Sequence, residues 1–151
     1  MKLEYLMECT VILQRPPQDL TVGPFGSRLI FPVTGGSFEG PRLKGTILPG
    51  GGDWLLMGDD GIGRLDVRAT LETDDGALIY LQYFGIGRSD PARSAATPGA
   101  PEEYGERYYM ITPRFETGDE QYAWLNGFVC VAEGKRTPEG VDYRVYAVVN
   151  D

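Results

Sequence analysis

The chain has 151 residues, of which 42% are apolar and 24% charged, and this composition fits one soluble globular domain covering residues 1–151. Its 22 acidic and 14 basic residues give a formal charge of −8, which disfavours binding of nucleic acid through the phosphate backbone. No apolar run approaches the roughly 20 residues that span a bilayer, and acidic residues interrupt the N-terminal segment where a signal peptide is apolar. We therefore expect a cytoplasmic protein with no membrane partner.

Two absences restrict the chemistry further. The chain has no histidine, which excludes histidine-based triads, histidine proton shuttles and the common histidine metal sites. Its two cysteines, Cys9 and Cys130, form no metal-binding motif, so we expect neither a metal nor a cofactor. Both lie in apolar runs typical of buried free thiols, and a disulfide between them is the alternative if their strands adjoin.

Short β-rich runs separated by turns predict an all-β fold. The 21 glycines and 11 prolines exceed the average usage of about 12% and are spread along the whole chain. The expected strands cover residues 3–13, 28–33, 44–48, 53–57, 65–72, 77–84, 107–112, 122–132 and 141–149. No segment shows sustained helical periodicity, apart from a turn near residues 119–122.

The clearest hairpin covers residues 65–84. Apolar and polar residues alternate strictly from Leu65 to Glu72, and Asp74-Asp75-Gly76 then supplies residues that tolerate a tight reversal. The returning run, Ala-Leu-Ile-Tyr-Leu-Gln-Tyr-Phe84, is apolar or aromatic on both faces. Both faces must then be covered, and in a closed barrel one of them faces the lumen.

Residues 86–106 form a long insertion between two expected strands, rich in glycine, proline, alanine and serine. Unstructured loops of this length are uncommon inside compact domains, and many of them cover binding sites. The insertion is interpreted either as a lid over one barrel mouth or as a plain loop.

Leu48-Pro-Gly-Gly-Gly-Asp-Trp54 is the most unusual segment. Three glycines permit backbone conformations that other residues do not allow, but neither a helix nor a lysine follows to hold a phosphate. Either the turn presents Asp53 and Trp54 to a pocket, or Asp53 only hydrogen-bonds nearby backbone amides. Glu39, inside another glycine-rich segment, is either a carboxylate within a barrel or a surface charge.

Residues 115–126 gather aromatic, acidic and amide side chains. On an expected strand, Tyr122, Trp124 and Asn126 share one face, like the wall of a pocket in which aromatic rings stack on a ligand and the amide donates hydrogen bonds. The alternatives are that these aromatic side chains pack outward against a loop, or that the segment closes one end of a barrel.

These segments resemble the DUF3237 family, whose members are also called UPF0311 proteins. The matching segments are residues 34–45, 48–54, 73–80 and 113–126, followed by a final strand at 141–148. The resemblance implies a single antiparallel β-barrel of the calycin or lipocalin type, with about 8–10 strands and an open lumen. This chain departs from the family pattern in residues 86–106, which we expect to form a long loop at one mouth. It also implies a small hydrophobic ligand. The residues that it places in the lumen are Asp53, Trp54, Arg68, Tyr80, Phe115, Tyr122, Trp124 and Asn126.

The first functional hypothesis is a cofactor-independent isomerase, cyclase or lyase that acts on a small aromatic or polyketide-like molecule. Asp53 is its general acid and base, assisted by Tyr80 or Tyr109, while Arg68 and Asn126 stabilise an enolate or phenolate. The residues expected to contact the substrate are Trp54, Phe115, Tyr122, Trp124, Tyr109 and Glu39.

The alternatives are a non-catalytic barrel that binds a hydrophobic small molecule and a structural subunit whose barrel is packed solid. A buried carboxylate with a raised pKa favours the enzyme, whereas a uniformly apolar lumen favours the binding protein. Because several strands carry aromatic residues on both faces, we also expect a homodimer or a higher homo-oligomer.

Overall fold

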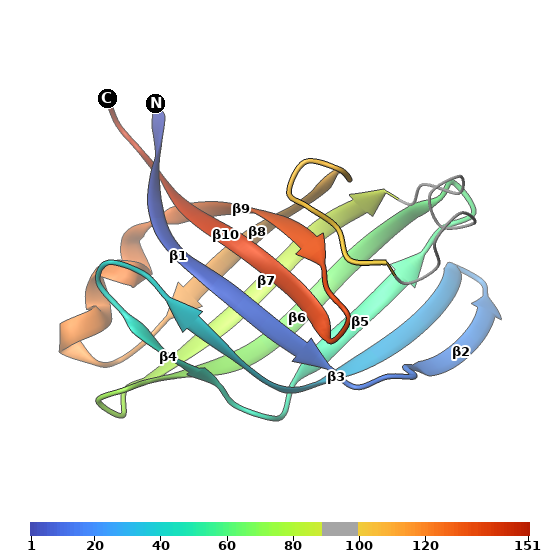
Figure 1. The fold of residues 1–151 in the computed structure, drawn as a ribbon, viewed down its shortest axis with the longest axis horizontal. Helices are drawn as coiled ribbons and strands as arrows, with labels where there is room; N and C mark the ends of the chain where they lie inside the picture. The colour runs from blue at the N-terminus through green and yellow to red at the C-terminus, as the bar shows by residue number, and fades with distance from the viewer. Residues whose placement is uncertain (89–99) are drawn as a thin grey trace.

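Ten strands and one short helix make up the chain in the computed structural model, which describes residues 1–88 and 100–151 (Figure 1). The strands are β1 (Lys2–Leu13), β2 (Gln18–Gly23), β3 (Gly26–Glu39), β4 (Lys44–Ile47), β5 (Gly52–Met57), β6 (Ile62–Thr73), β7 (Leu78–Arg88), β8 (Tyr109–Glu116), β9 (Val129–Arg136) and β10 (Gly140–Val149). The helix, η1, is a 3-10 helix over Glu120–Gly127. Much of the expected lid, residues 89–99, lies outside the described residues, so the lid stays a prediction.

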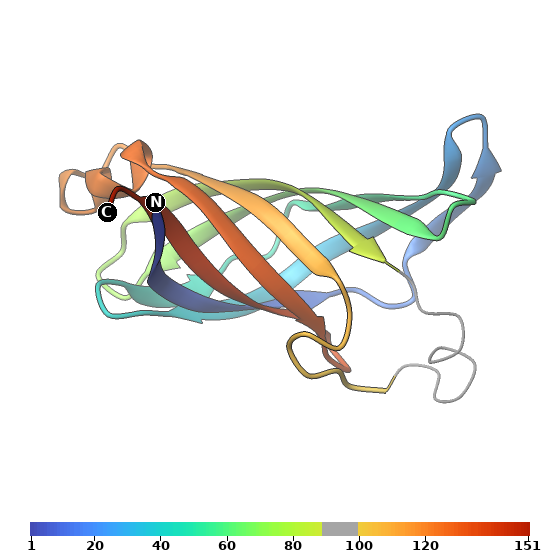
Figure 2. The ribbon, with the colours of Figure 1, turned by 90° about the horizontal axis from the view of Figure 1, so that it is seen from above.

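The strands close into a barrel because β1 pairs with both β10 and β3. From β1 the neighbours follow the order β10, β9, β8, β7 and β6, and every pairing is antiparallel. β4 and β5 then occupy successive stretches of one position between β6 and β3, so the closed barrel has eight positions (Figure 1 and Figure 2). The prediction of an all-β, antiparallel barrel is confirmed.

The β6–β7 hairpin has the alternation that the sequence predicts. Leu65, Val67, Ala69 and Leu71 are at most 5% exposed and belong to the barrel core, while the residues between them face outward. At the turn, the amide of Gly76 donates a hydrogen bond to the Thr73 carbonyl, and its φ of 91° favours glycine. The described part of one chain covers the inner face of β7 but leaves Phe84 on its outer face 57% exposed, so covering of the outer face stays a prediction.

The segment before β9 is a helix rather than the first half of a strand, so the expected strand over residues 122–132 is wrong at its start. Asp119 caps the helix, because its side chain accepts a hydrogen bond from the Gln121 amide at 2.9 Å. Tyr122 and Leu125, three residues apart, are both buried in the core. This segment closes one end of the barrel, which was one of the alternatives for the aromatic cluster (Figure 1).

The two cysteines lie in the barrel wall and are buried free thiols. The disulfide alternative is wrong, because Cys9 belongs to β1 and Cys130 to β9, and β10 lies between these strands. Burial raises the pKa of Cys9 to about 12 and that of Cys130 to about 11, so both stay protonated at neutral pH.

Candidate functional site

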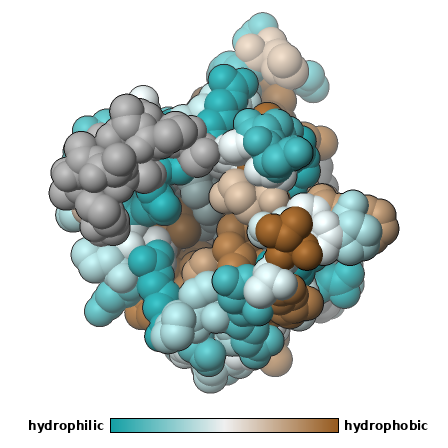
Figure 3. Space-filling model, turned by 90° about the vertical axis from the view of Figure 1, so that its right-hand side faces the viewer, coloured by the Kyte–Doolittle hydropathy of each residue, from teal (hydrophilic) through white to brown (hydrophobic). Residues whose placement is uncertain are grey.

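A cavity of about 390 Å³ occupies the barrel end opposite to η1. Its lining comes from β3 and β5, from the C-terminal ends of β1, β7 and β9 with the residues that follow β1, and from the N-terminal ends of β6, β8 and β10. These strand ends meet because neighbouring strands are antiparallel. Figure 3 faces this end of the molecule, where hydrophobic side chains lie in a hollow surrounded by hydrophilic ones. The apolar side chains of the cavity are Leu13, Pro16, Pro17, Phe31, Leu55, Met57, Leu65 and Val141. Its polar side chains are Asp53, Tyr109, Arg15, Arg107 and Arg136.

The triple-glycine turn places Asp53 in this cavity. Gly50 and Gly51 have φ values of 107° and 78°, and a Cβ on Gly51 would lie 2.2 Å from the Arg68 carbonyl oxygen. The turn therefore lets β5 enter between β3 and β6, where Asp53 pairs with the inward-facing Val67 of β6. Of the two interpretations of this turn, the one in which it presents a side chain to a pocket is correct for Asp53.

Asp53 is only 6% exposed, and burial raises its pKa from 3.8 to about 7. The Asp66 amide donates a hydrogen bond to Asp53 Oδ1 at 3.2 Å and lowers the pKa in part, while the Asp66 charge raises it and that of Arg28 lowers it. Within residues 1–88 and 100–151, the second carboxylate oxygen has no hydrogen-bond partner. A carboxyl group of this kind is divided between its acid and base forms at neutral pH and can transfer a proton in either direction.

Tyr109 is the second titratable group of the cavity. Its hydroxyl accepts a hydrogen bond from the Tyr143 hydroxyl at 3.4 Å, and the two ring centroids are 5.9 Å apart. Burial raises the pKa of Tyr109 well above its ordinary value of 10, and the nearby Asp53 raises it further. Tyr109 is therefore neutral at physiological pH and can donate a hydrogen bond to a ligand oxygen.

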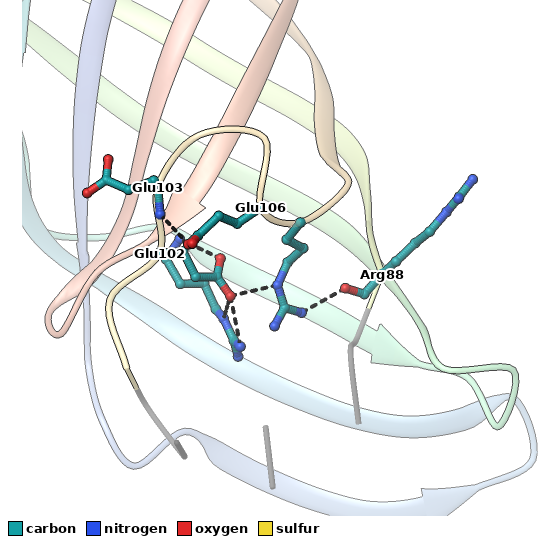
Figure 4. A network of polar contacts seen from close by, with 6 residues as sticks. Arg88, Glu102, Glu103 and Glu106 are labelled. Carbon is teal, nitrogen blue, oxygen red and sulfur yellow. Dashed lines mark hydrogen bonds and ion pairs between the residues drawn. The ribbon is translucent and has the colours of Figure 1, made fainter. Parts of the chain in front are cut away.

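An ion-pair network that the sequence analysis missed forms one side of the cavity mouth (Figure 4). Glu102, which is buried, accepts hydrogen bonds from Arg107 Nε at 2.8 Å and from Arg136 Nε and the Arg136 amide, both at 3.1 Å. Burial alone would raise the pKa of Glu102, but these hydrogen bonds and the two guanidinium charges lower it. No sequence pattern identifies this network, because Glu102 and Arg136 are 34 residues apart and meet only in the fold.

Three of the residues expected in the lumen lie on the outside of the barrel. Tyr80 stands between the buried Ile79 and Leu81 on β7, so alternation turns its side chain outward. Arg68 on β6 and Trp54 on β5 are exposed for the same reason, since Trp54 directly follows the inward-facing Asp53. Their placement in the lumen is wrong, and none of the three lines the cavity that contains Asp53.

The expected pocket wall of residues 115–126 lies at the closed end of the barrel. Phe115 faces the packed core, and the Tyr122 hydroxyl donates a hydrogen bond to Asp75 at 2.9 Å. Trp124 is half-buried beneath the Arg42 guanidinium, 3.6 Å from the ring centroid. The Asn126 side chain bonds both the amide and the carbonyl of Thr117, so it holds the loop before η1.

Glu39 also lies away from the cavity, because its side chain is exposed at the end of β3. Of the two interpretations of Glu39, a surface charge is therefore correct and a carboxylate within the barrel is wrong. Of the ten site residues expected from the sequence, the structure brings only Asp53 and Tyr109 together in one cavity.

A larger hollow of about 940 Å³ lies on the outer surface over β7, β8, β9 and β10. Its walls are mainly apolar and include Leu3, Phe84, Met110 and Tyr146. We assign the site to the smaller cavity inside the barrel, because that cavity contains the buried carboxyl group and the tyrosine.

Within the described residues, no group of three or more cysteine, aspartate or glutamate side chains is arranged to hold a metal ion. In the same part of the chain, the structure has no helix with the length and apolar character needed to cross a membrane.

Known proteins resemble this chain over nearly its whole length. The family described as DUF3237, protein of unknown function, matches residues 1–148. A UPF0311 protein from Rhodopseudomonas palustris is 32% identical over 126 residues, which is 82% of each chain. Its crystal structure, aligned at 28% identity, covers 99% of both chains with a TM-score of 0.90. A β-barrel-like protein from Acinetobacter baumannii is 39% identical, and its crystal structure covers 97% of this chain and 94% of its own with a TM-score of 0.82.

One relative has a named activity. The hydroalkoxylation enzyme phnH of Penicillium herquei is 32% identical over 94 residues, which is 62% of this chain and 48% of the relative. The crystal structure of an enzyme from the same organism is 23% identical, has a TM-score of 0.74 and shows the same fold over 98% of this chain and 94% of its own. The match over residues 1–148, together with the relatives above 30% identity, shows that this chain belongs to the DUF3237 family.

Proposed function

We propose that the protein is a cofactor-independent acid–base enzyme, an isomerase, cyclase or lyase, which acts on a small hydrophobic molecule in the open half of the barrel. The observation that carries this proposal is a buried carboxyl group, Asp53, whose pKa is raised to about 7 in a cavity that also contains Tyr109. A non-catalytic binding protein needs no such group, and a solid barrel leaves no cavity for it.

The proposed step is a proton relocation within one molecule. The Asp53 carboxylate removes a proton from a hydroxyl group or from a carbon next to a carbonyl, and the electron pair moves onto the substrate oxygen. The neutral Tyr109 hydroxyl donates a hydrogen bond to that oxygen while its negative charge develops. Asp53, now a carboxylic acid, returns the proton to a different atom, so the step consumes no other reactant.

The relative from Penicillium herquei supports a reaction of this kind. Hydroalkoxylation adds a hydroxyl O–H across a carbon–carbon multiple bond, which also moves a proton from oxygen to carbon without a net change in oxidation state. Its resemblance covers only part of each chain, so we take from it the reaction type and not the substrate.

The test is native mass spectrometry of the purified protein after incubation with fractionated small-molecule extracts in D₂O. We expect the wild type to release an isomer or fragment of the bound molecule that has gained solvent deuterium, and Asp53→Asn to hold the molecule unchanged. Asp59→Asn, which neutralises an exposed carboxylate in the β5–β6 turn, is the matched control and should behave as the wild type. If wild type and Asp53→Asn both retain the same unaltered molecule, the binding-protein alternative replaces the enzyme.

A further inference from the structure

The Arg107 guanidinium is incompletely satisfied at the cavity mouth. Its side chain is only 8% exposed, Nε donates to Glu102, and Nη1 donates to the Arg88 carbonyl oxygen at 2.8 Å (Figure 4). The remaining nitrogen, Nη2, is buried and has no hydrogen-bond partner in the described part of the chain. Buried donors without partners are rare in native proteins, and each one calls for a functional or structural explanation.

The position of Arg107 supplies that explanation. Arg107 lines the same cavity as Asp53 and Tyr109, so a ligand in the cavity can bring an acceptor to it. Two anchors hold the guanidinium in place, which means that little side-chain freedom is lost when the third nitrogen binds an oxygen.

The charge around the cavity agrees with an anionic ligand. Arg15, Arg107 and Arg136 contribute three guanidinium charges, whereas Asp53 and Glu102 are the carboxyl groups that line the cavity or pair with its arginines. The sum is positive whichever form Asp53 takes, although the whole chain carries a formal charge of −8. A cavity of opposite sign to the rest of the protein attracts anions selectively.

We propose that the cavity binds a small hydrophobic molecule that carries an anionic oxygen, such as a carboxylate, enolate or phenolate, and that Arg107 Nη2 is its hydrogen-bond donor. Arg136 and Arg15 add positive charge at the rim. The ligand thus has an apolar body facing the aliphatic and aromatic lining and an anionic oxygen directed to the arginine side of the mouth. The inference requires the cavity to bind a ligand and does not require turnover.

The experiment compares two probes with the same ring system, 2-naphthoate and 2-naphthamide, by isothermal titration calorimetry at neutral pH and low ionic strength. We expect the wild type to bind the carboxylate at least tenfold more tightly than the amide, as is typical of a charge-assisted hydrogen bond. Equal affinities, or no binding of the carboxylate at millimolar concentration, overturn the inference.

Two matched variants locate the anion contact. Arg107→Gln should bring the affinity ratio of the probes close to one. Arg114→Gln removes the same charge from the outer surface, where Arg114 bonds Gln82, and should retain the preference. A preference that survives in Arg107→Gln overturns the inference.

If Arg107→Gln does not fold, the side-chain Nε–H signal of Arg107 in ¹⁵N NMR of the wild type decides. 2-Naphthoate must shift it more than 2-naphthamide, and equal shifts overturn the inference. Asp53→Asn separates this inference from the proposed function, because it should abolish turnover and still prefer the carboxylate probe.

Discussion

Gly134 of β9 lies directly beneath the ring of Tyr109. A Cβ added at Gly134 would come within 2.6 Å of Tyr109 Cδ1 and 2.9 Å of Tyr143 Cε1. The absence of a side chain at this one position therefore gives both rings the room that they occupy. Tyr109 reaches the cavity because of a glycine on the neighbouring strand, 25 residues further along the chain.

Gly134→Ala tests this relationship. The added methyl group must displace the Tyr109 and Tyr143 rings, so we expect a loss of about 1–3 kcal/mol in the free energy of unfolding, measured with urea. Gly118→Ala is the control, because a Cβ there meets nothing within 4 Å. Equal stability of the two variants would show that the rings adjust without cost.

The raised pKa of Asp53 predicts a pH-dependent stability. The unfolded chain ionises Asp53 near 3.8 and the folded chain near 7, so between these values the folded state holds a proton that the unfolded state has lost. The stability that Asp53 contributes is full below about pH 4, falls as the pH rises, and is lost above about pH 7, a change of about 4 kcal/mol. Urea unfolding of wild type and Asp53→Asn across this range measures it; parallel curves would contradict the raised pKa.

Tyr109→Phe separates the hydroxyl from the ring. The ring still fills its place above Gly134, and among residues 1–88 and 100–151 the hydroxyl takes part in one long hydrogen bond, so we expect less than about 1 kcal/mol of lost stability. The turnover assigned to the cavity should fall by about 10²–10³, as when one oxyanion donor is removed. Tyr143→Phe removes the other hydroxyl of the pair without altering the cavity lining and should have a much smaller effect.

Glu102→Gln tests the ion-pair network at the mouth. The substitution leaves Arg107 and Arg136 without their shared carboxylate, so we expect a loss of about 2 kcal/mol, below the value for a fully buried pair because the Arg136 side chain is 40% exposed. Amide hydrogen exchange of Glu102 and Arg136 should accelerate, since the two residues bond each other through both backbone and side chain. Glu103→Gln removes an exposed carboxylate next door and is the control. Equal amide hydrogen-exchange rates in Glu102→Gln and Glu103→Gln would mean that the backbone hydrogen bond between Glu102 and Arg136 is sufficient to keep the two residues paired.

Self-association stays a prediction, and the outer apolar surface gives it a location. Phe84 and Met110 are exposed in the walls of the hollow over β7, β8, β9 and β10. We expect light scattering after size-exclusion chromatography to give a mass above that of one chain, and Phe84→Asp to lower it. Leu20→Asp, on the exposed strand β2, is the control and should leave the mass unchanged. A single-chain mass for the wild type at every concentration would contradict the prediction.

The sequence predicts much of the barrel because alternation is a local property. The strands from Leu65 to Phe84 and the turn at Gly76 follow directly from residue order. Prediction from alternation is wrong at Tyr122, where the structure has a helix and not a strand. A short capped helix with one buried side has a mixture of apolar and polar residues similar to that of a strand.

Prediction of the site was less complete. Asp53 was identified from the unusual glycine turn, but Trp54 was expected beside it in the lumen, although neighbouring residues of a strand face opposite sides. Arg107 was missed because its importance comes from contacts with Glu102 and Arg88 and from its place in the cavity, none of which has a local signature.

The closure of the barrel between its first and last strands has a consequence for biosynthesis. β10 lies between β1 and β9 in the ring, and the pair formed by Lys2 and Val149 joins opposite ends of the chain. During translation, β1 can pair with β3 early, but its other edge stays unpaired until β10 has left the ribosome. The nascent sheet therefore remains open, with its apolar inner face accessible, until β10 has been synthesised. Because the pairing that closes the barrel joins residues as distant as Lys2 and Val149, folding should show the slow kinetics typical of a high contact order.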